Sequence, residues 1–309
     1  TYNGSYVGPT LKAQPGDLLD LEVVNRLPSG QITNFHTHGL HVSPLGNGDN
    51  VLLEIQPGAS NRYQIRIPAD HPSGLYWYHP HHHTRVYDQI SKGLSGLLVI
   101  GDADGGATQL DSYTSHLLAL KNALVTGSTI QIPPSSSMPS NPIQTFTVNG
   151  QLNPVLKVPQ GQGQVFNVAN MGANAFYSLQ LNTAPDGSGT SIPLILVGQD
   201  GNPLYTARAN PGGPLGALGL PPGRRWSFTY DLSQNTSLLE AGDTLYLIGL
   251  SNSGQSGTNL WDVWPNTSTK PSTTVDVGTL NAGINAKQTR ISVRSSSQLP
   301  IVNGFTITI

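Results

Sequence analysis

The chain has 309 residues, a formal net charge of −2 and only 10% charged residues. So weak a charge creates no strong electrostatic field, and we therefore predict neither nucleic acid nor a membrane surface as a partner. The chain contains no cysteine, which excludes disulfide bonds, thiolate nucleophiles and metal ions held by thiolates. It also has no run of about 18 apolar residues, so no membrane-spanning helix is predicted.

The composition favours strands over helices. The chain has 35 glycines and 24 prolines, and such a turn-rich composition with few helix-forming residues is typical of all-β proteins. The length is enough for two domains, each with its own hydrophobic core. We therefore predict an all-β chain with two domains.

The first predicted domain covers residues 1–105. Within it, residues 17–25 alternate apolar and polar side chains in part, residues 61–67 alternate, and residues 96–100 form a short apolar run. Both patterns, with turn residues between them, predict the short strands of a β-sandwich.

Residues 106–142 are predicted to connect the two domains. Residues 117–124 within this segment have helical spacing, although the stretch is short and has no clear helix cap. Residues 132–142 are rich in proline and serine, which predicts an extended linker.

The second predicted domain covers residues 143–309 and repeats the strand pattern of the first. Its strand-like runs are residues 145–150, 155–158, 164–169 and 177–181. A Pro-Gly turn followed by an alternating strand occurs in both halves, at residues 57–65 and 221–230. The two domains are therefore predicted to be sandwiches of related design.

The histidines are confined to the first part of the chain, where all nine lie between His36 and His116. His36 and His38 are two residues apart, and so are His79 and His81. Residues two apart in a strand share a face, so two such strands side by side would bring four imidazoles together. An imidazole set suits copper and zinc, and the lack of carboxylate and thiolate partners favours copper.

The alternative is that these histidines are surface residues or hydrogen-bonded strand residues, which is the usual reading of a single His-x-His pair. Here Phe35 flanks one pair, and Tyr76, Trp77 and Tyr78 precede the other. In so apolar a setting an imidazole without a partner costs free energy, and metal coordination supplies a partner. The two pairs together therefore favour a metal site.

The motifs around these pairs resemble those of laccase-type multicopper oxidases. The similar segments are residues 33–44, 48–50, 67–81 and 93–100 for the first domain of that family, and residues 146–151 and 220–224 for its second. The resemblance implies two cupredoxin-like Greek-key β-sandwich domains and copper as the cofactor. It also implies that His36 is a type 2 copper ligand and that His38, His79 and His81 are type 3 ligands.

Further roles follow from the same resemblance. Asp49 occupies the position of a carboxylate that helps to deliver protons to oxygen bound at the copper cluster, although an aspartate in a loop also fits a turn-shaping role. His41, His71 and His83 would lie at the rim or behind the ligands, and His116 would be structural.

The sequence departs from the family pattern after His116, because no histidine follows it and no cysteine is present. A complete enzyme of the family resembles a relay: a type 1 copper, held by two histidines and a cysteine, feeds electrons to a cluster of three coppers held by eight histidines. This chain has four of those cluster ligands. Oxygen-reducing oxidase activity is therefore expected only if a third cupredoxin domain, or a homodimer through the first domain, completes the site.

Two other functions remain open. The chain could be a stand-alone copper protein for storage, delivery or tolerance, or a non-catalytic binding scaffold with an idle cluster. Hydrolysis is not expected, because no Gly-x-Ser-x-Gly segment or paired-carboxylate signature stands out. The low charge and the Asn-x-Ser/Thr triplets at Asn3, Asn235 and Asn266 predict an extracytoplasmic protein, either periplasmic or secreted.

Overall fold

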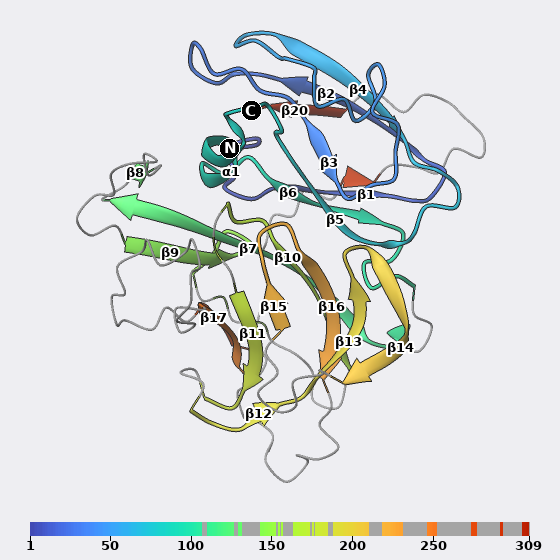
Figure 1. Ribbon diagram of the computed structural model, residues 1–309, viewed down its shortest axis with the longest axis vertical. Coiled ribbons are helices and arrows are strands. Elements are labelled where there is room, and N and C mark those ends of the chain that lie inside the picture. Colours follow the sequence, from blue (N-terminus) through green and yellow to red (C-terminus); the bar gives the residue numbers. More distant parts are fainter. Residues whose placement is uncertain are drawn as a thin grey trace.

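The computed structural model has an all-β fold of two cupredoxin-like sandwiches, as predicted, with the short helix α1 (Val86–Ser91) beside the first sandwich (Figure 1). In the part of the chain that the structure describes, no helix has the length and apolar character that a membrane span needs. The described residues are 1–106, 110–126, 129–131, 143–152, 154, 156, 163–173, 175, 177–184, 188–209, 218–230, 246–251, 273–276, 291–292 and 305–308.

The first sandwich joins strands from both ends of the sequence. Its strands are β1 (Gly8–Ala13), β2 (Leu18–Val24), β3 (His36–His38), β4 (Ser60–Arg66), β5 (Gly74–His79), β6 (Gly96–Ile100), β19 (Ile291–Ser292) and β20 (Phe305–Thr308). One sheet has the order β19-β1-β6-β5-β3, and the other has the order β20-β2-β4. The late strands β19 and β20 pair in parallel with β1 and β2, so red and blue strands lie together in Figure 1.

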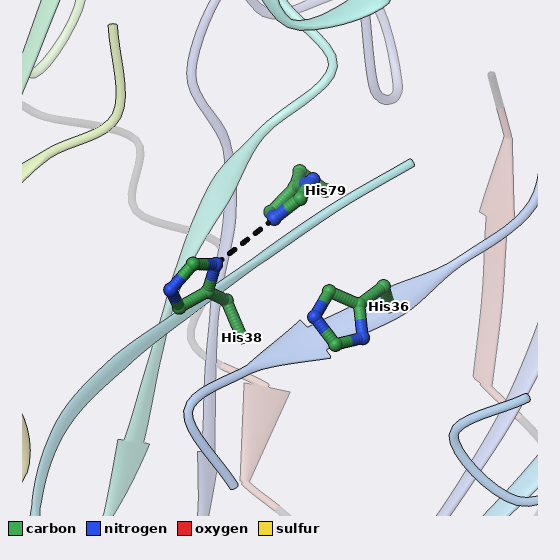
Figure 2. A group of neighbouring side chains, drawn as sticks. All are labelled: His36, His38 and His79. Atoms are coloured by element: carbon green, nitrogen blue, oxygen red, sulfur yellow. Dashed lines mark hydrogen bonds between the residues drawn. The ribbon is translucent and has the colours of Figure 1, made fainter. Parts of the chain in front are cut away.

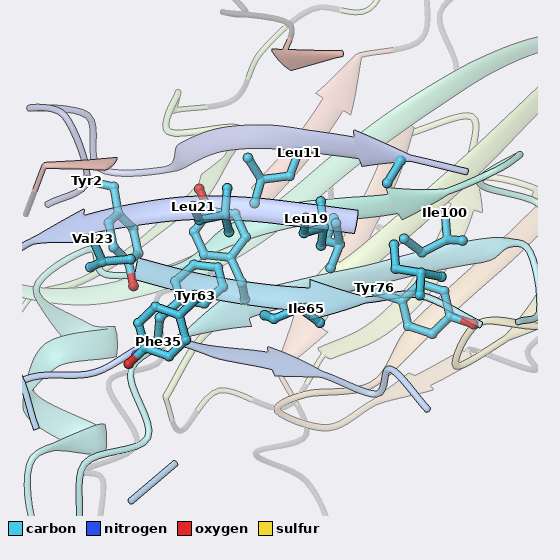
Figure 3. Packing of buried hydrophobic residues seen from close by; sticks show 14 of the residues in the cluster. Tyr2, Leu11, Leu19, Leu21, Val23, Phe35, Tyr63, Ile65, Tyr76 and Ile100 are labelled. Carbon is cyan, nitrogen blue, oxygen red and sulfur yellow. The ribbon is translucent and has the colours of Figure 1, made fainter. Parts of the chain in front are cut away.

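Strands β2 and β4 place one face on the core of this sandwich (Figure 3). Leu21 pairs with Tyr63 in antiparallel register, and both side chains are fully buried. Their sequence neighbours Glu22 and Arg62 are exposed. An antiparallel sheet with one face on a core requires this alternation, and the strands predicted at residues 17–25 and 61–67 are confirmed.

Strands β5 and β6 are buried along their whole length. Tyr76 and Tyr78 face the core of the first sandwich. Trp77 and Leu97 face the other way and pack with Ala119 of the second sandwich. A strand covered on both faces reads as a continuous apolar run, which explains the pattern of β6.

The second sandwich is built from the middle of the sequence. Its strands are β7 (Thr114–Thr126), β8 (Thr129–Gln131), β9 (Ile143–Val148), β10 (Gln164–Asn170), β11 (Tyr177–Asn182), β12 (Ser191–Ile192), β13 (Leu194–Gln199), β14 (Asn202–Ala209), β15 (Leu218–Leu220), β16 (Arg225–Tyr230), β17 (Tyr246–Ser251) and β18 (Thr273–Asp276). One sheet has the order β14-β13-β16-β10-β7-β8, with β9 on β7, and the other has the order β12-β11-β17-β18, with β15 on β11. Phe166, Tyr177 and Phe228 pack in the core between them.

The stretch with helical spacing, residues 117–124, belongs to strand β7, so the helical interpretation is wrong. β7 pairs with β10 and with β9. Leu118 and Leu120 enter the core of the second sandwich, whereas Ala119 packs toward the first. Apolar side chains on both faces of the strand remove the alternation that would have marked it as a strand.

The remaining predicted segments have mixed outcomes. The runs at residues 145–150, 164–169 and 177–181 form β9, β10 and β11. The run at residues 155–158 lies mostly outside the described residues, and the predicted linker at 132–142 lies entirely outside them. Because β7 and β8 come before residue 143, part of the predicted connecting segment contributes strands to the second sandwich.

Candidate metal centre

Strands β3 and β5 bring His36, His38 and His79 to the same face of the first sheet. The strands are antiparallel, with His36 opposite His79 and His38 opposite Trp77. Ligand nitrogens of His36, His38 and His79 all lie within 4.8 Å of one another (Figure 2). Three imidazole nitrogens at this spacing form a group that could hold a metal ion.

His81 follows the end of β5 and is also close. Its ring centroid lies 5.0 Å from that of His36 and 5.8 Å from that of His79. The His81 side chain is the most exposed of the four, whereas His79 is buried. The backbone N–H of His81 donates to the Oδ1 atom of the buried Asn34 at 2.6 Å, which places His81 beside the other three histidines.

The imidazoles at the buried side of the cluster are neutral. Burial lowers the pKa of His79 well below its ordinary value. Burial, followed by the positive charge of Arg225, lowers the pKa of His38 to about 4. A neutral imidazole keeps the lone pair that a metal ion requires.

Hydrogen bonds indicate which nitrogens carry protons. His79 Nδ1 lies 2.9 Å from the carbonyl oxygen of Pro80, to which it donates. The Nε2 atom of His79 therefore has no proton, and its lone pair accepts a hydrogen bond from His38 Nδ1 at 3.2 Å. This lone pair points into the cluster.

Asp49 holds His36 in place. Its carboxylate oxygens lie 3.1 and 3.0 Å from His36 Nδ1, and Oδ1 accepts the backbone N–H of Thr37 at 2.8 Å. A carboxylate that accepts from Nδ1 leaves Nε2 of the same ring available to a metal ion. The Asp49 side chain thus contacts the candidate ligand and its strand.

Trp77 also lines the centre, although the spacing of the motifs did not identify it as a residue of the site. Its ring stacks on that of His79 with centroids 4.2 Å apart, and it lies 4.9 Å from that of His38. The signal was present in the sequence, because Trp77 is two residues before His79 and shares its strand face.

The other histidines are held by separate contacts. His71 Nε2 accepts the backbone N–H of His41 at 3.0 Å, and His71 Nδ1 donates to Pro72. His82 pairs with Glu54 at 3.0 Å. Strand β5 ends at His79, so His83 does not continue its strand face, and the His83 side chain is exposed.

His116 lies in the second sandwich. Its Nε2 atom donates to Gln164 Oε1 at 2.6 Å, and its ring stacks on Phe166 at 5.4 Å. Both partners are buried residues of β10, so His116 joins β7 to β10 within the second sandwich.

Comparisons with known proteins identify relatives of this fold and site. Residues 1–105 match the sequence profile of the multicopper oxidase family. A multicopper oxidase of Staphylococcus haemolyticus is 27% identical over 256 residues, covering 80% of this chain and 52% of the relative. The cell division protein FtsP of Yersinia pestis is 26% identical over 253 residues, covering 78% of this chain and 48% of the relative.

The solved structures agree with the sequence matches. A variant of the McoA multicopper oxidase from Aquifex aeolicus superposes with a TM-score of 0.68 at 21% identity, over 95% of this chain and 59% of that chain. The predicted resemblance is confirmed: this chain is a partial match to the multicopper oxidase family and has its cupredoxin fold. The chain spans about half the length of the curated relatives that it matches.

The donor set fits the cofactor that the family implies. Multicopper oxidases use copper, and neutral imidazoles are ligands that copper favours. The centre combines three imidazole rings, whose ligand nitrogens lie within 4.8 Å of one another, with a carboxylate that orients one of them. The residues on the sheet face are therefore compatible with copper.

Proposed function

We propose that this chain binds copper through His36, His38, His79 and His81, which form half of a type 2/type 3 copper cluster. The observation that carries the proposal is the group of three histidine nitrogens within 4.8 Å of one another, with the ring of His81 beside it. A third cupredoxin domain, or a second copy of the chain docked through the first sandwich, would supply the remaining ligands for oxygen reduction.

Copper held at this centre would supply one-electron redox chemistry and a binding site for dioxygen. The chain's own residues would hold and orient the ligands. Asp49 fixes the Nδ1 proton of His36, and as a buried carboxylate next to the cluster it is placed to give up or take a proton. Trp77 covers one side of His79 and excludes water there.

Electron entry to the cluster would require a type 1 copper, whose ligands are not all present in this chain. A type 1 copper requires a thiolate, and the chain has no cysteine. We therefore propose that the chain alone has little or no oxidase activity toward phenolic substrates, and that activity appears when a completing domain or partner is present.

The proposal is tested by metal analysis, electron paramagnetic resonance and absorption spectroscopy on copper-loaded protein. We expect bound copper with a type 2 signal and no intense blue band. Protein that remains copper-free after loading under copper-replete conditions would favour a binding scaffold. A blue band intrinsic to the chain would contradict the inference that a chain without cysteine has no type 1 copper. Light scattering on the same sample shows whether a dimer forms.

We also propose an extracytoplasmic location. The low charge of the chain and the exposed position of Asn3, in the Asn-Gly-Ser triplet, support it. Asn235 and Asn266 lie outside the described residues. Fractionation of cells that express the full natural gene checks the location.

A further inference from the structure

We propose that the second sandwich, which supplies no ligand of its own, positions His38: the turn at residues 221–224 forms a wall of the metal centre, and Arg225 is a positioning residue for both ligand strands. This inference rests on the proposed copper site. It assigns a role to the second Pro-Gly turn of the sequence.

Gly223 brings the backbone of this turn against the His38 ring. A Cβ atom at this position would lie 3.4 Å from His38 Cε1 and 3.7 Å from the Trp77 ring. The residue has a φ of +82°, which glycine adopts without strain. A larger side chain would therefore extend into the space of the two rings.

The turn is held firmly in this place by β10. Gly223 N–H donates to the carbonyl of Asn170 at 2.9 Å, and Asn170 N–H donates to the carbonyl of Arg224 at 3.0 Å. The Asn170 side chain is fully buried and donates to the carbonyl of Leu220 at 2.9 Å. These three hydrogen bonds leave the wall little freedom to move.

Arg225, at the start of β16, ties the turn to β5. Its side chain is buried, and three of its nitrogens donate to backbone carbonyls: Nε to Leu75 at 3.3 Å, Nη1 to Gly223 at 2.7 Å and Nη2 to Asp200 at 3.0 Å. The Asp200 carboxylate lies 3.7 Å from Nη1 and offsets the charge. The guanidinium thus joins the wall to the strand that carries Trp77 and His79.

The same guanidinium contacts the other ligand strand. Gly39 directly follows His38, and a Cβ atom there would lie 2.6 Å from Arg225 Nη2. The guanidinium carbon also lies 5.8 Å from the centre of the Tyr76 ring. Arg225 therefore packs between the end of β3 and the beginning of β5, and its position is coupled to the spacing of the two strands.

If Gly223 and Arg225 only joined the two sandwiches, their substitution would leave the metal centre unchanged. The distinguishing measurement is a property of His38 itself, namely the NMR resonance of its Cε1 proton, identified by its loss in His38→Gln. In the metal-free protein this signal reports on the wall, and in the loaded protein copper affinity and the paramagnetic resonance spectrum report on the ligand geometry.

The chain offers a matched control for Gly223→Leu. Gly58 lies in the corresponding Pro-Gly turn before β4 and has a φ of +86°. Among the described residues, no other atom lies within 4 Å of the place that its Cβ would occupy. Gly58→Leu therefore introduces the same backbone strain away from the centre. We expect Gly223→Leu to shift the His38 resonance, to lower copper affinity by about tenfold to a hundredfold and to change the copper hyperfine pattern, while Gly58→Leu keeps wild-type values.

Identical His38 resonances and copper affinities in the two leucine variants would overturn the proposal. If either variant fails to fold, Gly223→Ala and Gly58→Ala are compared in the same way, because the added Cβ still contacts the His38 ring only at position 223. If the wild-type chain binds no copper, the proposed function fails, yet the His38 resonance of the metal-free protein still tests the wall.

Arg225→Lys tests the second element of the proposal. A single ammonium nitrogen cannot span the three carbonyls that the guanidinium joins. Arg62→Lys is the control, because Arg62 of β4 forms an ion pair with Asp20 of β2, in the sheet that carries none of the candidate ligands. We expect the altered copper spectrum in Arg225→Lys only, and equal spectra in the two variants would refute the assignment.

Discussion

At the scale of single residues, the candidate centre depends on groups that fix the imidazoles as much as on the imidazoles themselves. Asp49 holds His36, Pro80 accepts from His79, and Asn34 places His81. Such partners determine which ring nitrogen is free and where it points, and their loss typically weakens metal binding about tenfold to a hundredfold.

The first prediction concerns Asp49. In Asp49→Asn the side chain can still accept the backbone N–H of Thr37, but it no longer offers a charged acceptor to His36 Nδ1. We expect copper affinity, measured by competition with a chelator, to fall by about tenfold or more. The exposed Asp111 is the control position, and an unchanged affinity in Asp49→Asn would mean that the carboxylate does not orient the ring.

A second prediction concerns Lys121, which is fully buried in β7. Its ammonium donates to the carbonyls of Tyr6 and Ile90 at 3.3 Å and to Ser95 Oγ at 2.7 Å. Burial lowers its pKa to about 7. Above that pH the folded chain has a neutral amine, while the unfolded chain keeps the proton up to its ordinary pKa near 10.4.

Because the unfolded state then binds more protons, the free energy of unfolding should rise with pH between about 7 and 10, by at most about 1.4 kcal/mol per pH unit. Below pH 7 both states carry the proton, so this rise disappears. Urea unfolding of the wild type and Lys121→Met across pH 6 to 9 checks this, since the variant should lack the rise. If the free energy of unfolding depended on pH in the same way in both proteins, Lys121 would have to stay charged in the folded state.

At the scale of elements, residue periodicity predicted the strands that have one face on a core, such as β2 and β4. It was ambiguous for β7, because this strand is apolar on both faces. The His-x-His spacing predicted that each pair shares a strand face. The antiparallel register that sets His36 opposite His79 depends on pairing between distant segments, and a single sequence does not specify it.

A third prediction tests how closely β5 and β6 pack. Gly96 of β6 lies against Tyr78 of β5, and a Cβ atom there would overlap the tyrosine hydroxyl. We expect Gly96→Ala to lower the free energy of unfolding by about 1–3 kcal/mol through overpacking. Gly219→Ala is the control in denaturant titrations, because in the part of the chain that the structure describes no atom lies within 4 Å of the place that its Cβ would occupy. Equal losses in the two variants would contradict the packing argument.

At the scale of the whole molecule, the second sandwich covers the face of the first that carries the histidines. Trp77 of β5 packs with Ala119, Ala169 and Met171 of the second sandwich, and β16 contacts β5 directly. Motif similarity pointed to residues 220–224, but their position beside His38 could not be predicted, because the contact joins segments far apart in the sequence. The centre therefore lies where the two sandwiches meet.

We propose that copper binds at the histidine face of β3 and β5. Copper content and affinity of the wild type, His79→Gln and His116→Gln, measured after dialysis against a chelator, test it most directly. We expect equal copper in the wild type and His116→Gln, because His116 lies in the second sandwich, and at least about tenfold weaker binding in His79→Gln. Equal copper in all three proteins, or none in the wild type, would contradict it.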